Sequence, residues 1–394
     1  MSWRLQRWRH LARRVRGSIA QRGLRGTLQR ILQAYQRRPA VDTHLDLLPL
    51  DAPFEPFALP VSDTPKVSVI VPIHGKLKWT LACLRSVARH AADAPFEVIV
   101  VDDASPDDSA ATLRRIDGLR LLQNAENLGF IGTCNAGAAA ARGDFLLFLN
   151  NDTQVTPGWL DTLLDCCLHE PDCGIAGSRL IYPDGRLQEA GGIVYADGAC
   201  WNTGRFEDRN DPRYRYRREV DYVSGAALMI PRRLFASIGG FDARYAPAYY
   251  EDADLAFSVR AAGRRVIYEP RSLVVHMEGT TSGTDVFAGV KQQQQVNQAR
   301  LAETWAGALQ RQPAPGTPVE RILRGDRPRI LVVDTTVPEP ARDSGSLRLT
   351  ALFHLLGPVA RVSGASSRSR DLRQIATGPR AGEEIPVEVD THVT

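Results

Sequence analysis

Apolar runs of strand length, separated by segments with helical spacing, constrain the fold of this chain more than any other feature of its sequence. The runs occupy residues 67–71, 97–101 and 144–149 and are rich in Val, Ile, Leu and Phe, as in strands buried on both faces. The helix-like segments are residues 79–92, 107–116 and 129–141. Because such alternation produces a mainly parallel, doubly wound sheet, we predict an α/β fold with a Rossmann-like sheet flanked by helices.

Composition and breakpoints divide the chain into five segments. Its 394 residues are 43% hydrophobic and 24% charged, which is ordinary for one large globular domain or two. After Phe353 no aromatic residue occurs, so we expect the last segment to begin a second domain and then continue as a tail that does not pack. The predicted segments are a basic arm at 1–40, a linker at 41–65, a core domain at 66–310, a proline-rich linker at 311–328, and the incomplete second domain at 329–394.

The N-terminal arm is strongly basic. Residues 1–38 contain eleven arginines and no acidic residue, with apolar residues from Trp3 to Val15 at helical spacing among them. This pattern fits a helix that lies on an anionic membrane surface, and it fits a solvated basic arm equally well. No recognisable nucleic-acid-binding module follows it, so we expect no nucleic acid partner.

The sequence indicates neither a membrane span nor an exported protein. It lacks an apolar run of about eighteen residues or more, and arginines interrupt the N-terminus where a signal peptide would need an apolar core. The six cysteines form no CxxC pair, so we expect neither a zinc site nor a disulfide framework. We predict a cytoplasmic protein, peripheral on the inner face of the cytoplasmic membrane if the arm binds lipid.

Polar side chains follow several of the predicted strands. Asp102 and Asp103 end the second apolar run, Asp152 follows the third, and His276 ends a later run at 273–276. Since the carboxyl ends of parallel strands meet at one edge of the sheet, where open α/β folds bind ligands, we expect these groups to lie close together. The Asp152 carboxylate suits Mg²⁺ or Mn²⁺, and a His276 nitrogen ligand would favour Mn²⁺.

Asp252 opens a predicted helix and has two interpretations. Its carboxylate could serve as a general base that takes a proton from an acceptor hydroxyl. Taken alone, however, an Asp at this position is more typical of an N-cap, which satisfies free backbone amides. The interpretation as a base depends on the other groups expected at the same edge.

A helix start at Asn127 and Gly129 could bind a diphosphate, together with Asn135 farther along the helix, because amides and small residues let phosphate approach closely. Asp102 and Asp103 could recognise a base or ribose, or could simply form a turn. The first strand leads into Pro72-Ile73-His74-Gly75, so no GxGxxG turn is present and a dinucleotide-dependent dehydrogenase is excluded. A nucleotidyltransferase is excluded because the same place lacks a glycine-rich basic loop.

Read in order, six motifs resemble those of the family 2 glycosyltransferases over residues 65–305. The resemblance implies a GT-A fold with a mixed acceptor-binding half, an inverting mechanism and a nucleotide-diphosphate sugar as donor. The motifs are Val-Ser-Val-Ile-Val-Pro at 67–72, Val-Val-Asp-Asp-Ala-Ser at 100–105, Asn-Leu-Gly-Phe at 127–130, Asn-Asn-Asp-Thr at 150–153, Gly-Gly-Phe-Asp at 239–242 and Glu-Asp-Ala-Asp-Leu at 251–255.

The resemblance also implies roles for individual residues. Asp252 is expected to be the catalytic base, with Glu251 and Asp254 shaping the acceptor site. The metal site is expected at Asp152 and His276. The donor nucleotide is expected to contact Pro72, Asp102, Asp103, Asn127, Gly129, Asn135 and Asn151.

By analogy with rhamnosyltransferase-like and galactofuranosyltransferase-like members, we expect dTDP-rhamnose as donor, with UDP- and GDP-sugars as alternatives. The acceptor is expected to be a growing surface polysaccharide or a lipid-linked glycan. Residues 329–356 are similar to the opening of a second glycosyltransferase domain, of GT-B type. The competing hypothesis is a catalytically silent module on the same fold that binds a glycan or a protein partner.

Overall fold

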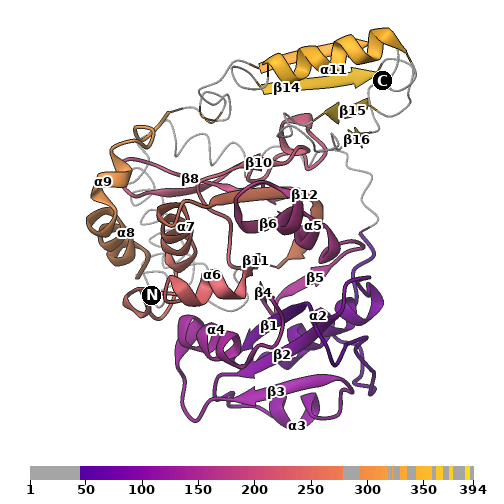
Figure 1. Cartoon of the computed structure of the whole chain (residues 1–394). Coiled ribbons are helices and arrows are strands. Elements are labelled where there is room, and N and C mark those ends of the chain that lie inside the picture. The colour runs from indigo at the N-terminus through magenta and orange to yellow at the C-terminus, as the bar shows by residue number, and fades with distance from the viewer. Residues whose placement is uncertain are drawn as a thin grey trace, which may run out of the picture. The chain divides into compact units, whose positions relative to one another are not determined.

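The computed structural model describes residues 45–277, 293–317, 319, 322, 329–334, 343–356, 361–366, 372–375 and 387–390. The predicted basic arm lies outside these residues. The chain divides into two compact units, Met1–Gly316 and Thr317–Thr394 (Figure 1). The boundary falls inside the linker predicted at 311–328.

The first unit is built on one large sheet. Its strand order is β10-β12-β6-β11-β4-β1-β2-β3, with β5 beside β12 and β7 beside β6. A short hairpin of β8 (Gly192–Val194) and β9 (Cys200–Asn202) stands apart from it. The strands of the large sheet are β1 (Val67–Ile73), β2 (Phe96–Asp102), β3 (Leu119–Gln123), β4 (Phe145–Leu149), β5 (Thr153–Val155), β6 (Cys173–Ile181), β7 (Leu187–Glu189), β10 (Arg218–Glu219), β11 (Ala227–Pro231) and β12 (Arg265–His276).

The half of the sheet formed by β4, β1, β2 and β3 is parallel throughout. It contains the three predicted apolar runs, and this part of the Rossmann-like prediction is confirmed. Strand β3 was missed, because its residues are only partly buried and its apolar signal is correspondingly weak. The helices that follow these strands are α2 (Leu77–Arg89), α3 (Ser109–Leu113) and α4 (Gly129–Ala140).

The other half of the sheet is mixed, as expected for a GT-A fold. Strand β11 runs antiparallel to both β4 and β6, whereas β12 runs parallel to β6. Strand β12 is longer than the predicted run at 273–276. The accompanying helices are α5 (Asp161–His169), α6 (Arg232–Ser237), α7 (Glu251–Ala261), α8 (Gln293–Thr304) and α9 (Ala306–Leu309), with short 3-10 helices η1 (Pro212–Tyr214) and η2 (Ala243–Tyr245).

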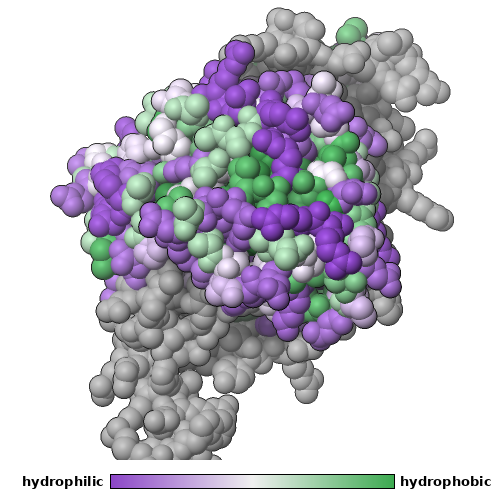
Figure 2. Space-filling model, turned by 90° about the horizontal axis from the view of Figure 1, so that it is seen from below, coloured by the Kyte–Doolittle hydropathy of each residue, from purple (hydrophilic) through white to green (hydrophobic). Residues whose placement is uncertain are grey.

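Apolar side chains alternate across β1 and supply cores on both faces of the sheet. Val67, Val69 and Val71 pack with side chains of α2 and α5, while Ile70 packs with side chains of α4 and α7 on the opposite face. Figure 1 shows these helices flanking the sheet. Figure 2 shows that one outer face mixes polar and apolar residues, with an apolar area near its middle.

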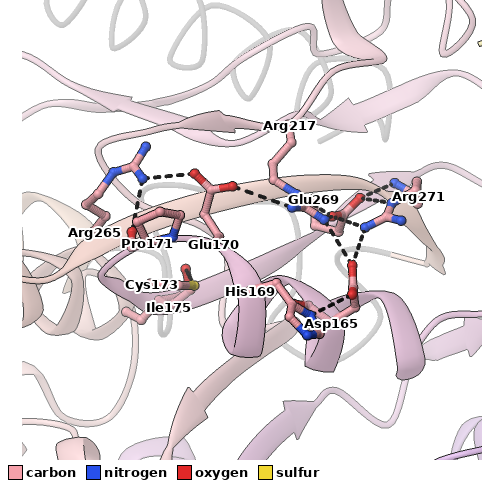
Figure 3. A network of polar contacts seen from close by, with 10 residues as sticks. All are labelled: Asp165, His169, Glu170, Pro171, Cys173, Ile175, Arg217, Arg265, Glu269 and Arg271. Atoms are coloured by element: carbon pink, nitrogen blue, oxygen red, sulfur yellow. Dashed lines mark hydrogen bonds and ion pairs between the residues drawn. The ribbon is translucent and has the colours of Figure 1, made fainter. Parts of the chain in front are cut away.

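A network of charged side chains joins α5 to β12 (Figure 3). Glu269 in β12 is fully buried, and its Oε2 accepts hydrogen bonds from Arg217 at 2.8 Å and Arg271 at 3.0 Å. Both arginines also reach Asp165 of α5, at 3.3 and 2.8 Å, and Arg265 reaches Glu170 at 2.9 Å. Each of these carboxylates is paired with at least one guanidinium group. The network therefore holds α5 and β12 together and leaves none of these carboxylates without a counter-charge.

The second unit contains a parallel pair, β13 (Arg329–Asp334) and β14 (Arg361–Ser366), separated in sequence by α11 (Ser344–Leu356). Within the segment predicted at 329–394, the structure also contains the antiparallel pair β15 (Leu372–Ile375) and β16 (Val387–Asp390). Backbone hydrogen bonds form these ladders, so they need no aromatic or strongly apolar sequence.

Two further predictions concern cysteines and membrane spans. The six cysteines are free thiols in the structure. Among the residues that the structure describes, no helix is both long and apolar enough to cross a bilayer.

Candidate functional site

The carboxyl ends of β1 and β2 lie side by side at one edge of the sheet, because the Asp103 amide donates to the Ile73 carbonyl at 2.8 Å. Just beyond β2, the Asp103 carboxylate accepts from the amides of Leu128 at 2.8 Å and Gly129 at 2.9 Å, and from Asn124 Nδ2 at 2.8 Å. Asp103 thereby fixes the start of α4 against this edge.

The remaining predicted nucleotide contacts near this edge are partly engaged within the protein. Asp102 is buried and accepts from the Ser105 amide at 3.0 Å, as the turn interpretation requires. Asn127 Nδ2 lies 3.4 Å from Nε2 of His74, whose Nδ1 lies 2.8 Å from the Asp103 carbonyl oxygen. Sequence reasoning did not select His74, although it follows the strand that contains Pro72.

Asn135 makes two hydrogen bonds to the backbone of Phe241. Its Nδ2 donates to the Phe241 carbonyl at 2.8 Å, and its Oδ1 accepts from the Phe241 amide at 3.0 Å. The side chain therefore joins α4 to the Gly-Gly-Phe-Asp turn at 239–242.

The predicted metal ligands meet at the junction of β4, β5 and β12. Strand β5 pairs antiparallel with β12 and places Thr153 opposite His276, so that His276 Nε2 lies 3.2 Å from Oδ1 of the buried Asp152. His276 Nδ1 lies 2.8 Å from Oε1 of Gln188, which can only accept. Gln188 thus orients the His276 ring so that Nε2 faces Asp152.

The two asparagines before Asp152 shape this turn. Asn151 is buried and its Nδ2 donates to Thr80 Oγ1 of α2 at 3.0 Å. The Asn150 amide donates to the Ala226 carbonyl at 3.0 Å, which brings the 224–226 loop beside the metal-ligand turn. In the described part of the chain, no group of three or more His, Cys, Asp or Glu side chains has metal-binding geometry.

Asp252 lies in the first turn of α7 and is not its N-cap, because the helix begins at Glu251 and Tyr250 occupies the cap position. Its Oδ1 accepts from the Ala253 amide at 2.8 Å and its Oδ2 from the Gly225 amide at 3.3 Å. Burial nevertheless raises the pKa of Asp252 above its ordinary value, since these amide bonds oppose the cost of desolvation only in part.

The other two acidic residues of this motif differ from each other. Glu251 is buried; desolvation and the charge of Asp252 raise its pKa to about 8, and its Oε2 has no hydrogen-bond partner. Asp254 accepts from Trp305 Nε1 at 2.7 Å and from Tyr245 OH at 3.1 Å. Asp254 therefore links α7 to the α8–α9 junction and to η2.

Glu189, at the end of β7, is a buried acid that sequence reasoning missed. Its Oε1 accepts from the Ser224 amide at 2.8 Å, while Oε2 has no hydrogen-bond partner. Desolvation is the main cause that raises the pKa of Glu189 to about 8; the charge of Asp252 also raises it, and His276 and Arg205 oppose the shift. Its sequence signal, Gln-Glu-Ala-Gly-Gly at 188–192, lies in no apolar pattern and stands far from the other acids.

Strand β7 connects the Asp152–His276 pair with Asp252. Gln188 contacts His276, Glu189 accepts from Ser224, and the next amide, of Gly225, donates to Asp252. Side chains from a strand end, a turn and a helix start are thereby gathered in one place: Asp152, His276 and Asp252.

Residues 68–238 match the family described as Glycosyl transferase family 2. The chain is 30% identical over 222 residues to the N-acetylglucosaminyl-diphospho-decaprenol L-rhamnosyltransferase of Mycobacterium tuberculosis, which covers 50% of this chain and 71% of that protein. This chain belongs to glycosyltransferase family 2.

Two longer relatives of this family 2 chain are also 30% identical to it. They are the O-antigen biosynthesis protein RfbC of Myxococcus xanthus, over 58% of this chain and 18% of that protein, and the uncharacterized protein y4gI of Sinorhizobium fredii, over 59% and 26%. This family 2 chain thus spans about a quarter or less of the length of these two relatives. Among solved structures, GalNAc-T7 with UDP, GalNAc and Mn²⁺ is similar at 17% identity and a TM-score of 0.49, covering 63% of this chain and 49% of that one.

Proposed function

We propose that this chain is an inverting, metal-dependent glycosyltransferase that moves a sugar from a nucleotide-diphosphate sugar to a hydroxyl group of an acceptor glycan. The observation that carries the proposal is the contact path from His276 through Gln188, Glu189 and the 224–225 turn to Asp252. This path of contacts connects the Asp152–His276 pair, proposed to bind a cation, with Asp252, proposed as the base. Displacement at an anomeric carbon requires both groups.

The Asp152–His276 pair fits a divalent cation of the Mn²⁺ or Mg²⁺ type. A carboxylate and an imidazole nitrogen, 3.2 Å apart, form a mixed O/N donor set that favours Mn²⁺ over Mg²⁺. Two protein ligands suffice, because such ions are commonly held by one or two side chains together with substrate phosphates. The bound cation would neutralise charge that develops on the leaving diphosphate; Gln188 keeps the His276 lone pair available for it.

Asp252 is proposed as the general base. Its carboxylate would accept the proton of the acceptor hydroxyl while that oxygen forms a bond to the anomeric carbon, and the bond from this carbon to the diphosphate oxygen breaks on the opposite face. Attack from the opposite face inverts the configuration. A raised pKa suits this role, since a base works best when its pKa approaches the working pH.

The donor nucleotide is proposed to bind where β1 and β2 end, at Pro72, Asp102 and Asp103, with Asn127 and Gly129 at the start of α4 and Asn151 near the phosphates. We propose dTDP-rhamnose as donor, because a relative that the chain covers to 71% is named as an L-rhamnosyltransferase. UDP- and GDP-sugars are the alternatives to be screened. Glu251, buried beside Asp252, is proposed to line the acceptor side.

The acceptor is proposed to be a lipid-linked glycan or a growing surface polysaccharide at the cytoplasmic face of the membrane. The names of the two relatives, an O-antigen biosynthesis protein and a transferase acting on a diphospho-decaprenol, support this class. The basic arm would hold the enzyme on anionic lipid. If a chain without residues 1–40 sediments with anionic vesicles as well as the full chain does, the membrane part of the proposal is wrong.

The test is a screen of dTDP-, UDP- and GDP-sugars for hydrolysis and transfer with Mn²⁺ or Mg²⁺. We expect Asp252→Asn to lower kcat by about a hundredfold or more while donor still binds, and Asp152→Ala to weaken metal-dependent donor binding. The exposed Asp144 (side chain 61% exposed) changed to Asn is the matched control and should behave as wild type. Failure of every donor to bind with either metal would favour the silent binding module.

A further inference from the structure

Two buried carboxyl groups next to Asp252 have an oxygen without a partner. Among the described residues, Oε2 of Glu189 and Oε2 of Glu251 are the buried carboxyl oxygens without a hydrogen bond. The charge of Asp252 raises the pKa of both groups. Since an unsatisfied buried polar atom costs free energy that a fold ordinarily avoids, this grouping around one carboxylate points to a ligand that completes the hydrogen bonds.

Glu189 is fixed in place from one side only. Its Oε1 is held by the Ser224 amide at 2.8 Å, and the side chain is 1% exposed. The charged groups that act on it are Asp252 of α7, His276 of β12 and Arg205 in the loop after β9. Asp252, whose charge acts on Glu189, keeps part of its surface open to solvent.

The position of Glu189 identifies the part of the substrate that it meets. In an in-line displacement the anomeric carbon lies between the leaving oxygen, at the cation, and the attacking oxygen, at the base. Glu189 acts electrostatically on members of both groups, His276 and Asp252, and its neighbour Gln188 touches His276 at 2.8 Å. The group that fills the space between cation and base is the transferred sugar ring.

We propose that Oε2 of Glu189 binds a hydroxyl group of the transferred sugar and thereby helps to select the donor. This inference rests on the proposed function and adds a specificity residue to it. A buried carboxyl built to hydrogen-bond a sugar hydroxyl is left unpaired by a donor that lacks that hydroxyl, so such a donor is rejected far more strongly than one that differs by a methyl group. A nucleoside diphosphate lacks the transferred sugar, so we expect its affinity not to depend on Glu189.

The experiment compares two ligands on each variant. Calorimetry with Mn²⁺ measures the Kd of the nucleotide sugar found in the donor screen and of the matching nucleoside diphosphate, for wild type, Glu189→Ala and Glu189→Asp. The shorter Asp keeps the acid but withdraws it from the hydroxyl. We expect the Kd of the nucleotide sugar to rise about tenfold or more in both variants, with the Kd of the nucleoside diphosphate unchanged within about twofold.

Glu219, with a half-exposed side chain, is changed to Ala and to Asp as the matched control, and thermal unfolding shows which variants are folded. If Glu189→Ala does not fold, Glu189→Asp carries the test by the same criterion. Equal losses for both ligands, or no loss for either, overturn the inference. A wild type that binds no nucleotide sugar contradicts the proposed function itself, so the two failures are distinguishable.

Discussion

At the residue scale, the acidic side chains near the sheet edge differ in how completely the fold satisfies them. Asp254 accepts two hydrogen bonds from within the protein. Glu189 and Glu251 each keep one oxygen unpartnered. Side chains that are left unsatisfied in a buried place are better candidates for substrate contacts than side chains whose bonds are complete.

The pKa of Glu251 leads to a stability prediction. Its pKa is about 8 in the folded chain against 4.5 for the free side chain, so the folded state holds the proton more tightly. The contribution of Glu251 to stability is therefore fully present below pH 4.5 and is lost as pH rises toward about 8. Glu251→Gln cannot lose a proton, and we expect its melting temperature to fall less than that of wild type between pH 5 and pH 8.

Thermal unfolding of both proteins in EDTA, at pH values from 5 to 8, measures this difference. Glu219→Gln, at a half-exposed position, is the control and should follow the wild-type curve. Parallel curves for wild type and Glu251→Gln would show that Glu251 is already ionised in the fold.

At the element scale, close packing of α4 on the sheet sets the position of the start of that helix, where Asp103 is bound. Gly137 allows this approach: a Cβ added there would lie 2.5 Å from Ile70 Cγ2 of β1 and 3.0 Å from Val101 Cγ2 of β2. The charged network of Figure 3 holds α5 against β12, because Arg217 and Arg271 contact both Glu269 of β12 and Asp165 of α5. Contacts between elements, more than helix propensity, thus hold the site together.

We expect Gly137→Ala to lower the free energy of unfolding by about 1–3 kcal/mol, because both neighbouring strands are packed and cannot move away. The gain in helix propensity, about 0.5–1 kcal/mol, does not offset this. Gly307→Ala in α9 is the matched control; no atom lies within 4 Å of its added Cβ, so it should be neutral or stabilising. Urea unfolding of both variants decides, and equal stabilities would contradict the packing argument.

At the scale of the whole molecule, the first compact unit ends at Gly316 and includes α8 and α9. Leu301 of α8 is fully buried in the core. The buried Asn297 donates from Nδ2 to the carbonyls of Tyr245 at 2.8 Å, Ala248 at 3.1 Å and Tyr249 at 2.9 Å. These bonds fix the segment that precedes α7, so the C-terminal helices of this unit support the position of Asp252.

We therefore expect a chain that ends at Gly316 to fold and to melt within about 2 °C of the full chain, since the unit has its own core. A chain that ends at Met277 lacks α8 and α9, and should melt well below it or aggregate. Calorimetry on the three chains tests this. Equal melting of the two shortened chains would show that α8 and α9 do not stabilise the unit.

The sequence by itself determined the α/β class and the parallel strands, and it singled out Asp152, Asp252 and His276 as candidates, because apolar runs and strand-end residues are local signals. It did not reveal Glu189 or Gln188, nor the packing roles of Asn135 and Asp254. Those depend on contacts between distant segments: Asn135 bonds a residue 106 positions away, and Gln188 meets His276 across 88 positions. Only the tertiary structure brings such groups together, because hydrogen-bond satisfaction and burial are decided after the elements have packed.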